Sequence, residues 1–231
     1  MVDLPSQPLA DIDPEFEKIA LETGQFTCGL AGASTREKLP LCLANDICRQ
    51  HLGLTLRLHV EAALAHGVPF ANLLAVIRFM GPYAGYPACA DALARLAAIG
   101  TELGVDIRSA ATAAGRGGAA APTGQPLRPG EDEGVADPWL AGFSASRTGR
   151  SWGLPGLTER ERAYLTLTAD VARQTLGAPF RRHVQLARDG GATPGEIRDV
   201  VRFMAEFGIA AAAAALRELD SILGAAAPGT R

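Results

Sequence analysis

The sequence predicts an all-helical protein made of two related helical units in tandem. The main observation is an internal repeat: shifting the 231-residue sequence by 124 places Asp13–Met80 on Asp137–Met204 without a gap. Of the 68 aligned positions, 23 are identical, several-fold more than unrelated segments share by chance. No segment shows the period-2 alternation of a half-buried strand, so we expect essentially no sheet. We predict a first unit over residues 13–107 and a second over 137–225, related by pseudo-symmetry.

Each unit carries the same start and stop signals for helices. Asp13-Pro14 and Asp137-Pro138 each place a capping side chain before a proline in the first helical turn. A glycine-rich loop follows, GLAGAST in the first unit and GLPGLTE in the second. Thr193-Pro194-Gly195-Glu196 is typical of a capping box. Further helices, several of them ended by glycine, are expected over 35–52, 54–66, 159–176 and 179–189.

The segment between the units has a different composition. Residues 108–136 are rich in Gly, Ala and Pro and nearly devoid of large apolar side chains. Such a segment cannot bury a core of its own, so we interpret it as a flexible surface linker.

Composition and charge exclude several classes of protein. The net charge is −3 with no run of basic residues, which argues against nucleic-acid binding. No uncharged apolar stretch is long enough for a membrane span, and the acidic start does not resemble a signal peptide. We therefore expect a cytoplasmic protein whose four cysteines are free thiols. Nucleotide, zinc and serine-hydrolase motifs are missing, which predicts neither a cofactor nor a metal.

Two histidines occupy the same place in the two units. His59 and His183 each lie on an apolar face of a predicted helix, which turns the ring inward, where its pKa can be tuned. A core histidine with one hydrogen bond is one interpretation, and a catalytic acid or base is the other.

Two arginines lie in strongly apolar helical segments. Arg78 occurs in LLAVIRFM and Arg202 in IRDVVRFM, and a buried arginine needs a charged partner. Asp46 and Asp170 are the expected partners, which would give internal ion pairs. Alternatively, the planar fork of Arg78 holds a substrate carboxylate.

Further candidates come from the helix starts and breaks. Glu37 opens a long helix, where it either caps the N-terminus or relays a proton to His59. Tyr83 and Tyr86 in GPYAGYPA lie beside a helix break, where tyrosines often line a pocket. The second unit has Phe207 opposite Tyr83, so we expect the productive pocket in the first unit, with Trp152 as a wall.

The runs LRLHVEAALAHGVPFANLLAVIRFMGPYAGYPACADAL and FRRHVQLARDGGATPGEIRDVV resemble the core of the carboxymuconolactone decarboxylases and the alkylhydroperoxidase-D-like proteins. The resemblance implies a small helical unit, here in tandem, that assembles as a homo-oligomer, with a trimer favoured. It also places the family's helix histidine on His59 and His183. The CxxC pair of the peroxidase branch is missing, since Leu52 and Thr55 occupy those positions, so thiol peroxidase activity is not expected.

The resemblance implies a cofactor-independent decarboxylase acting on a small carboxylated or lactone-like molecule. His59, Glu37 and Tyr83 would be catalytic, and Arg78, Tyr86, Trp152 and His183 would bind the substrate. The same residues would serve an isomerase, cyclase or ring-opening enzyme of specialised metabolism. A non-catalytic helical binding or assembly protein is the third alternative.

Overall fold

The computed structural model describes residues 9–116 and 136–225, and these residues contain helices and no strand. The helices of the first half are α1 (Pro14–Cys28), α2 (Thr35–Arg49), α3 (Leu54–Ala65), α4 (Phe70–Ala84), α5 (Tyr86–Glu102) and α6 (Ile107–Arg116). Those of the second half are α7 (Pro138–Trp152), α8 (Glu159–Arg173), α9 (Ala178–Asp189), α10 (Pro194–Phe203), the 3₁₀ helix η1 (Met204–Phe207) and α11 (Ile209–Ala225). The prediction of an all-helical fold is confirmed.

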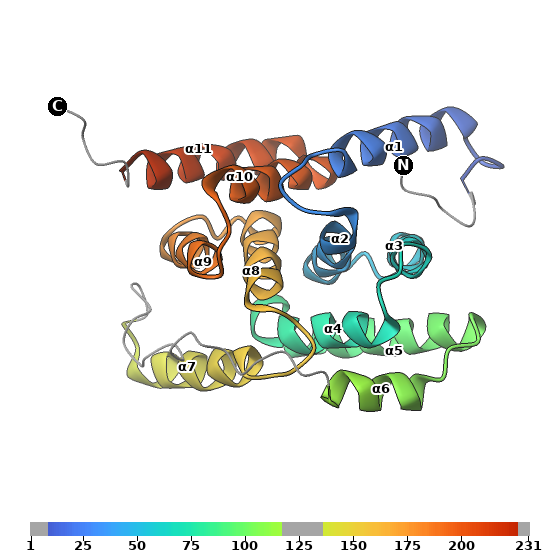
Figure 1. Cartoon of the computed structure of the whole chain (residues 1–231), viewed down its shortest axis with the longest axis horizontal. Helices are drawn as coiled ribbons and strands as arrows, with labels where there is room; N and C mark the ends of the chain where they lie inside the picture. Colours follow the sequence, from blue (N-terminus) through green and yellow to red (C-terminus); the bar gives the residue numbers. More distant parts are fainter. Residues whose placement is uncertain (1–8, 117–135, 226–231) are drawn as a thin grey trace.

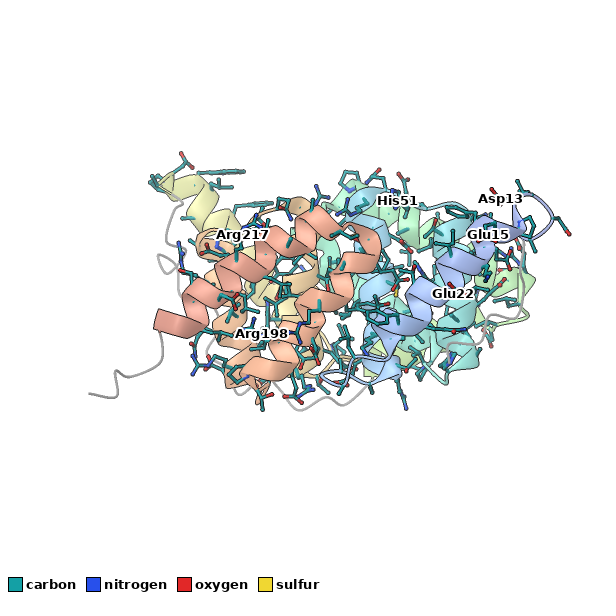
Figure 2. The ribbon with its side chains drawn as sticks, turned by 90° about the horizontal axis from the view of Figure 1, so that it is seen from above. Asp13, Glu15, Glu22, His51, Arg198 and Arg217 are labelled. Carbon is teal, nitrogen blue, oxygen red and sulfur yellow. The ribbon has the colours of Figure 1, made fainter. Side chains whose placement is uncertain are left out.

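The helices form three layers (Figure 1). The middle layer contains α9, α8, α2 and α3, with α2 packed against α8 at its centre. The layer drawn above contains α11, α10 and α1, and the layer drawn below contains α7, α4 and α5, with α6 beneath them. Seen from above, α1 lies at one end of the upper layer and α10 and α11 at the other (Figure 2).

The first helix of each half packs on the other half. Helix α1 contacts α10 and η1, whereas α7 contacts α4. Neither helix therefore finds its main support within its own half of the chain.

Equivalent signals begin the helices of both halves. The bounds of α1, α2 and α3 recur in α7, α8 and α9 exactly 124 residues later, and those of α5 recur in α11 after 123. The Asp13 side chain accepts from the Phe16 N–H at 3.0 Å, and the Asp137 side chain accepts from the Leu140 N–H at 2.7 Å. Capping boxes begin α2, α8 and α10.

The linker interpretation was wrong at its start. Residues 107–116 form α6, which packs on α4 and buries Ala114. The reason is that SAATAA is rich in the best helix former and offers a small apolar face for packing. The rest of the predicted linker, up to residue 135, lies outside the described residues.

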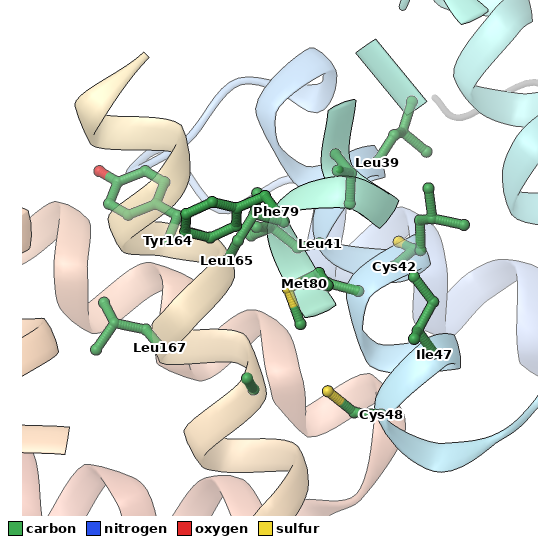
Figure 3. Close-up of a cluster of buried hydrophobic side chains, with 14 of the residues drawn as sticks. Leu39, Leu41, Cys42, Ile47, Cys48, Phe79, Met80, Tyr164, Leu165 and Leu167 are labelled. Atoms are coloured by element: carbon green, nitrogen blue, oxygen red, sulfur yellow. The ribbon is translucent and has the colours of Figure 1, made fainter. Parts of the chain in front are cut away.

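One part of the core fills the space between the middle layer and α4. Phe79, Met80, Tyr164 and Leu165 are buried there with side chains from α2 (Figure 3). No helix in the described part of the chain is long and apolar enough to cross a membrane.

Buried cations fix the two glycine-rich loops. Lys38 Nζ donates to the carbonyl oxygens of Cys28 and Leu30, and Arg162 donates to that of Leu154. Gly32 lets the first loop approach α10, since an added Cβ would lie only 2.8 Å from the Glu196 Cα. The loop after α1 is therefore held against the second half.

Candidate active site

Each half contains a histidine hydrogen-bonded to a buried aspartate. Nδ1 of His59 lies 2.6 Å from Oδ2 of Asp46, and Nδ1 of His183 lies 2.6 Å from Oδ2 of Asp170. Burial raises the pKa of Asp46, and the hydrogen bond with His59 partly offsets that rise. The aspartates expected to pair with arginines are therefore the partners of the histidines.

The expected burial of the two arginines is wrong. Arg78 is exposed and makes a long hydrogen bond of 3.4 Å to the Ala111 carbonyl oxygen in α6. Arg202 is also exposed and pairs with Asp199 on its own helix. Even a mostly apolar helix can keep one narrow face exposed to solvent, and both arginines lie on such a face.

An aromatic ring from the other half contacts each histidine. Phe207 of η1 meets His59 edge-on with ring centroids 6.0 Å apart, and Tyr83 of α4 meets His183 in the same way at 5.6 Å. Trp152 Nε1 donates to the Tyr83 hydroxyl oxygen at 2.6 Å. Tyr83 thus lies at His183 with Trp152 bonded to it, whereas both residues were predicted at the pocket of His59.

A cavity of about 490 Å³ opens at His59. This volume lies within the range of roughly 300–1,000 Å³ that is usual for small-molecule sites. Its lining comes from α1, from α2, from α3 with His59, and from η1. It is lined by Leu9, Phe16, Glu17, Ile19, Ala20, Leu21, Thr23, Gly24, Gln25, Cys28, Leu39, Cys42, Leu54, Thr55, Leu58, His59, Ala62, Glu206 and Phe207.

The cavity at His59 lies where the two halves differ in the size of one side chain. Cys28 at the end of α1 is equivalent to Trp152 at the end of α7, 124 residues later. The Trp152 indole packs against Phe79 and hydrogen-bonds Tyr83, which covers His183. The small thiol of Cys28 cannot fill the equivalent volume, so His59 faces a cavity.

The region from α7 to α11 matches a known family. Residues 138–221 match the carboxymuconolactone decarboxylase family. This part of the chain belongs to that family. No curated protein matches the chain. The region that matches the carboxymuconolactone decarboxylase family includes His183, Asp170 and Trp152, and it also supplies Glu206 and Phe207 to the cavity at His59.

The remaining sequence candidates lie away from this cavity. Glu37 Oε2 accepts from the Ser34 N–H at 2.8 Å and Oε1 accepts from Arg160 at 3.1 Å, so this carboxylate caps α2. Burial favours a higher pKa for Glu37, but the hydrogen bonds from Ser34 and the charge of Arg160 hold it below its ordinary value. Tyr86 is exposed and its ring lies over Gly81.

Sequence reasoning missed the two carboxylates of the cavity. Glu17 lies on α1 and Glu206 in η1, and Glu206 Oε2 accepts from the Thr27 hydroxyl at 2.6 Å. Sequence alone gives no sign that α1 packs on η1. The mismatch of CGLAG with WGLPG in the repeat was a usable signal for the cavity, since a thiol replaces an indole there.

The thiols at the cavity are poorly suited to nucleophilic or redox chemistry. Burial, reinforced by the nearby Glu206 carboxylate, raises the pKa of Cys28. Burial likewise raises the pKa of Cys42 well above its ordinary value. Since the thiolate is the reactive form, both groups are held in the unreactive form. No cluster of three or more possible metal ligands occurs in residues 9–116 and 136–225.

Proposed function

We propose that the chain is a cofactor-independent enzyme that moves a proton on a small molecule bound in the cavity at His59. The observation that carries the proposal is the combination of a histidine–aspartate pair with a cavity of ligand size at its ring. The His183 side chain in the equivalent pair is more buried, 10% exposed against 17% for His59, which favours His59 as the working histidine.

The hydrogen bond from Asp46 defines the role of His59. With Nδ1–H donated to the carboxylate, Nε2 is the ring nitrogen left to accept a proton. Nε2 would take a proton from a carbon next to a carbonyl group and return it to a carbon further along the conjugated system. The double bond moves, no atom is lost, and no electron acceptor is needed. Asp46 stabilises the imidazolium between the two steps.

The negative charge that develops on the carbonyl oxygen needs hydrogen-bond donors. Gln25 and Thr55 are among the residues that line the cavity, and their side-chain amide and hydroxyl can supply such donors. Isomerisation or ring opening of a small unsaturated molecule is therefore our first choice of reaction.

Decarboxylation is the second candidate, and the family of residues 138–221 favours it. In that reaction the carbon–carbon bond to the carboxylate breaks, carbon dioxide leaves, and His59 delivers the proton to the remaining carbanion. The lining offers no lysine or arginine among the described residues to hold the carboxylate. For this reason we rank it below the proton transfer.

Solvent deuterium exchange distinguishes these reactions. We would incubate the protein in D₂O with γ-carboxymuconolactone and with a neutral butenolide that carries no carboxyl group. NMR would follow deuterium incorporation and double-bond position, and headspace analysis would follow carbon dioxide. We expect exchange with at least one lactone, loss of about 10²-fold or more in His59→Gln, and little loss in His183→Gln.

The matched His183 variant is the control for folding. If both variants exchange as fast as the native chain, His59 is not the acid–base group. If neither lactone exchanges and neither loses carbon dioxide, the result favours the non-catalytic binding protein.

A further inference from the structure

The carboxylate of Glu17 lies at the cavity without a full set of partners. Glu17 is only 7% exposed, it lines the cavity, and its Oε2 has no hydrogen-bond partner. Burying a charged oxygen without a partner is costly, and native structures rarely leave such an atom unexplained. A bound molecule with a hydrogen-bond donor would remove this cost.

The fold itself does not require a carboxylate at this position. The residue equivalent to Glu17 in α7 is Ala141, which occupies the same turn of the helix after the same Asp-Pro start. Helix α7 forms with these bounds without an acidic side chain there. The buried carboxylate therefore occurs in α1, beside the cavity at His59, and not at the equivalent position of α7.

The charge around the cavity is negative. Glu17 and Glu206 both line it, and no lysine or arginine is among the described lining residues. The nearby ammonium of Lys38 is held by the carbonyl oxygens of Cys28 and Leu30. The carboxylates of Glu15 and Glu22 in α1, and that of its N-cap Asp13, lie on the exposed surface, as Figure 2 shows.

The rest of the lining is mostly apolar. Phe16, Ile19, Leu39, Leu58 and Phe207 contribute hydrocarbon or aromatic surface. Such a surface favours a molecule with an apolar body, because water is released when both surfaces are covered. A small anion would gain nothing from this lining and would be repelled by its two carboxylates.

We propose that the cavity binds an apolar organic amine in its protonated form, with Glu17 as the acceptor for the ammonium N–H. The terminal torsion of a glutamate is broad, so its carboxylate can turn one oxygen to the ligand. The apolar body of the amine then lies against α3 and Phe207, within reach of His59. This inference rests on the proposed function only in treating the cavity as the substrate site.

The test compares three probes of similar shape: 2-phenylethylamine, 2-phenylethanol and phenylacetate. Binding to the full chain at neutral pH would be measured by NMR titration of the protein amides. We expect the amine to bind most tightly and phenylacetate most weakly. Glu17→Gln should weaken amine binding about tenfold or more, because a charge-assisted hydrogen bond is lost, and should leave 2-phenylethanol nearly unchanged.

Glu22→Gln is the matched control, since it removes a carboxylate from the exposed face of the same helix. It should leave amine binding within about twofold of the native value, because screening weakens exposed charges. Circular dichroism would establish that each variant is folded.

Three outcomes overturn the inference: no binding of the amine, phenylacetate binding as tightly as the amine, or equal effects of the Glu17 and Glu22 variants. Failure of the proposed function gives a different pattern. Amine binding would then depend on Glu17, while His59→Gln would leave proton exchange unchanged.

Discussion

Phe207 lies edge-on against His59, with ring centroids 6.0 Å apart, although the two residues belong to opposite halves of the chain. The Tyr83 ring has the same relationship to His183 at 5.6 Å. Each histidine environment is therefore completed by a residue from the other half. The two environments differ in what lies beside the aromatic ring, a cavity at His59 and the Trp152 indole at Tyr83.

The Asp46 carboxylate should matter for turnover in a way that Asp170 does not. Asp46→Asn removes the acceptor that fixes the tautomer of His59, and loss of such an acceptor typically costs several orders of magnitude in rate. We expect deuterium exchange into the lactone probe to fall at least about 100-fold in Asp46→Asn.

Asp170→Asn breaks the equivalent hydrogen bond at His183 and serves as the control. Both variants should lose about 1–3 kcal/mol of unfolding free energy, because each disrupts a buried hydrogen bond. Equal losses of exchange in the two variants would show that the halves contribute equally to the reaction.

Exchanging the residues that distinguish the halves should close the cavity. Cys28→Trp places an indole where α7 has Trp152, and the cavity beside Cys28 has room for it. We expect this variant to lose binding of 2-phenylethylamine while its melting temperature stays within a few degrees of the native value. Unchanged amine binding would mean that the probe occupies a different site.

The reverse exchange tests the packing at Tyr83. Trp152→Cys removes the hydrogen bond to the Tyr83 hydroxyl and the contact with Phe79. Since Trp152 is partly buried, the unfolding free energy should fall by about 2 kcal/mol, measured by urea denaturation. A loss below about 0.5 kcal/mol would show that the indole adds little to the packing at Tyr83.

The helical fold could be predicted from the sequence because the residues that begin and end its helices are close together in the chain. Asp-Pro starts and capping boxes determine where helices begin, and glycines end many of them. Helix α6 was missed because an Ala-rich segment without large apolar residues is typical of linkers as well as of short helices. The division into two units at 13–107 and 137–225 stays a prediction, although the bounds of α1, α2 and α3 recur 124 residues later.

The site was harder to predict because its partners are distant in sequence. His59 was identified from its apolar helical face, but its partner Asp46 was assigned to Arg78. The repeat shows which residues are equivalent, but it does not show which residues are in contact. In the structure Tyr83 of α4 contacts His183, and Phe207 of η1 contacts His59. Tyr83 was therefore assigned to the wrong histidine.

The carboxylate of Glu196 should make the stability of the chain dependent on pH. Arg160 Nη2 donates a hydrogen bond to Glu196 Oε1 at 2.9 Å. This bond, together with the hydrogen bonds from Thr193, lowers the pKa of Glu196 from 4.5 to about 2. Because the folded-state pKa is lower than the unfolded one, the stabilisation is present above about pH 4.5 and is lost as the pH falls toward 2. Urea midpoints of Glu196→Gln should be lower than native at pH 7 and equal to native near pH 2.

Arg160 also hydrogen-bonds Glu37 and the Gly32 carbonyl oxygen, so this network joins the loop after α1 to α10. The surface variant Glu22→Gln is the control and should match the native midpoint throughout the range. A difference between Glu196→Gln and the native chain that persists unchanged to pH 2 would contradict the assignment.

Separating the halves should prevent either from folding alone. Helix α1 packs on α10 and η1, α7 packs on α4, and α2 packs on α8, so each half in isolation exposes the surfaces that normally bind the other. Core residues such as Phe79 and Tyr164 lie at this junction (Figure 3).

Fragments 1–116 and 136–231 should each aggregate or remain unfolded, whereas coexpression should yield a 1:1 complex that melts cooperatively. Light scattering and circular dichroism would provide the measurement, and a stable, cooperatively melting monomer from either fragment would show that the junction is not needed for folding.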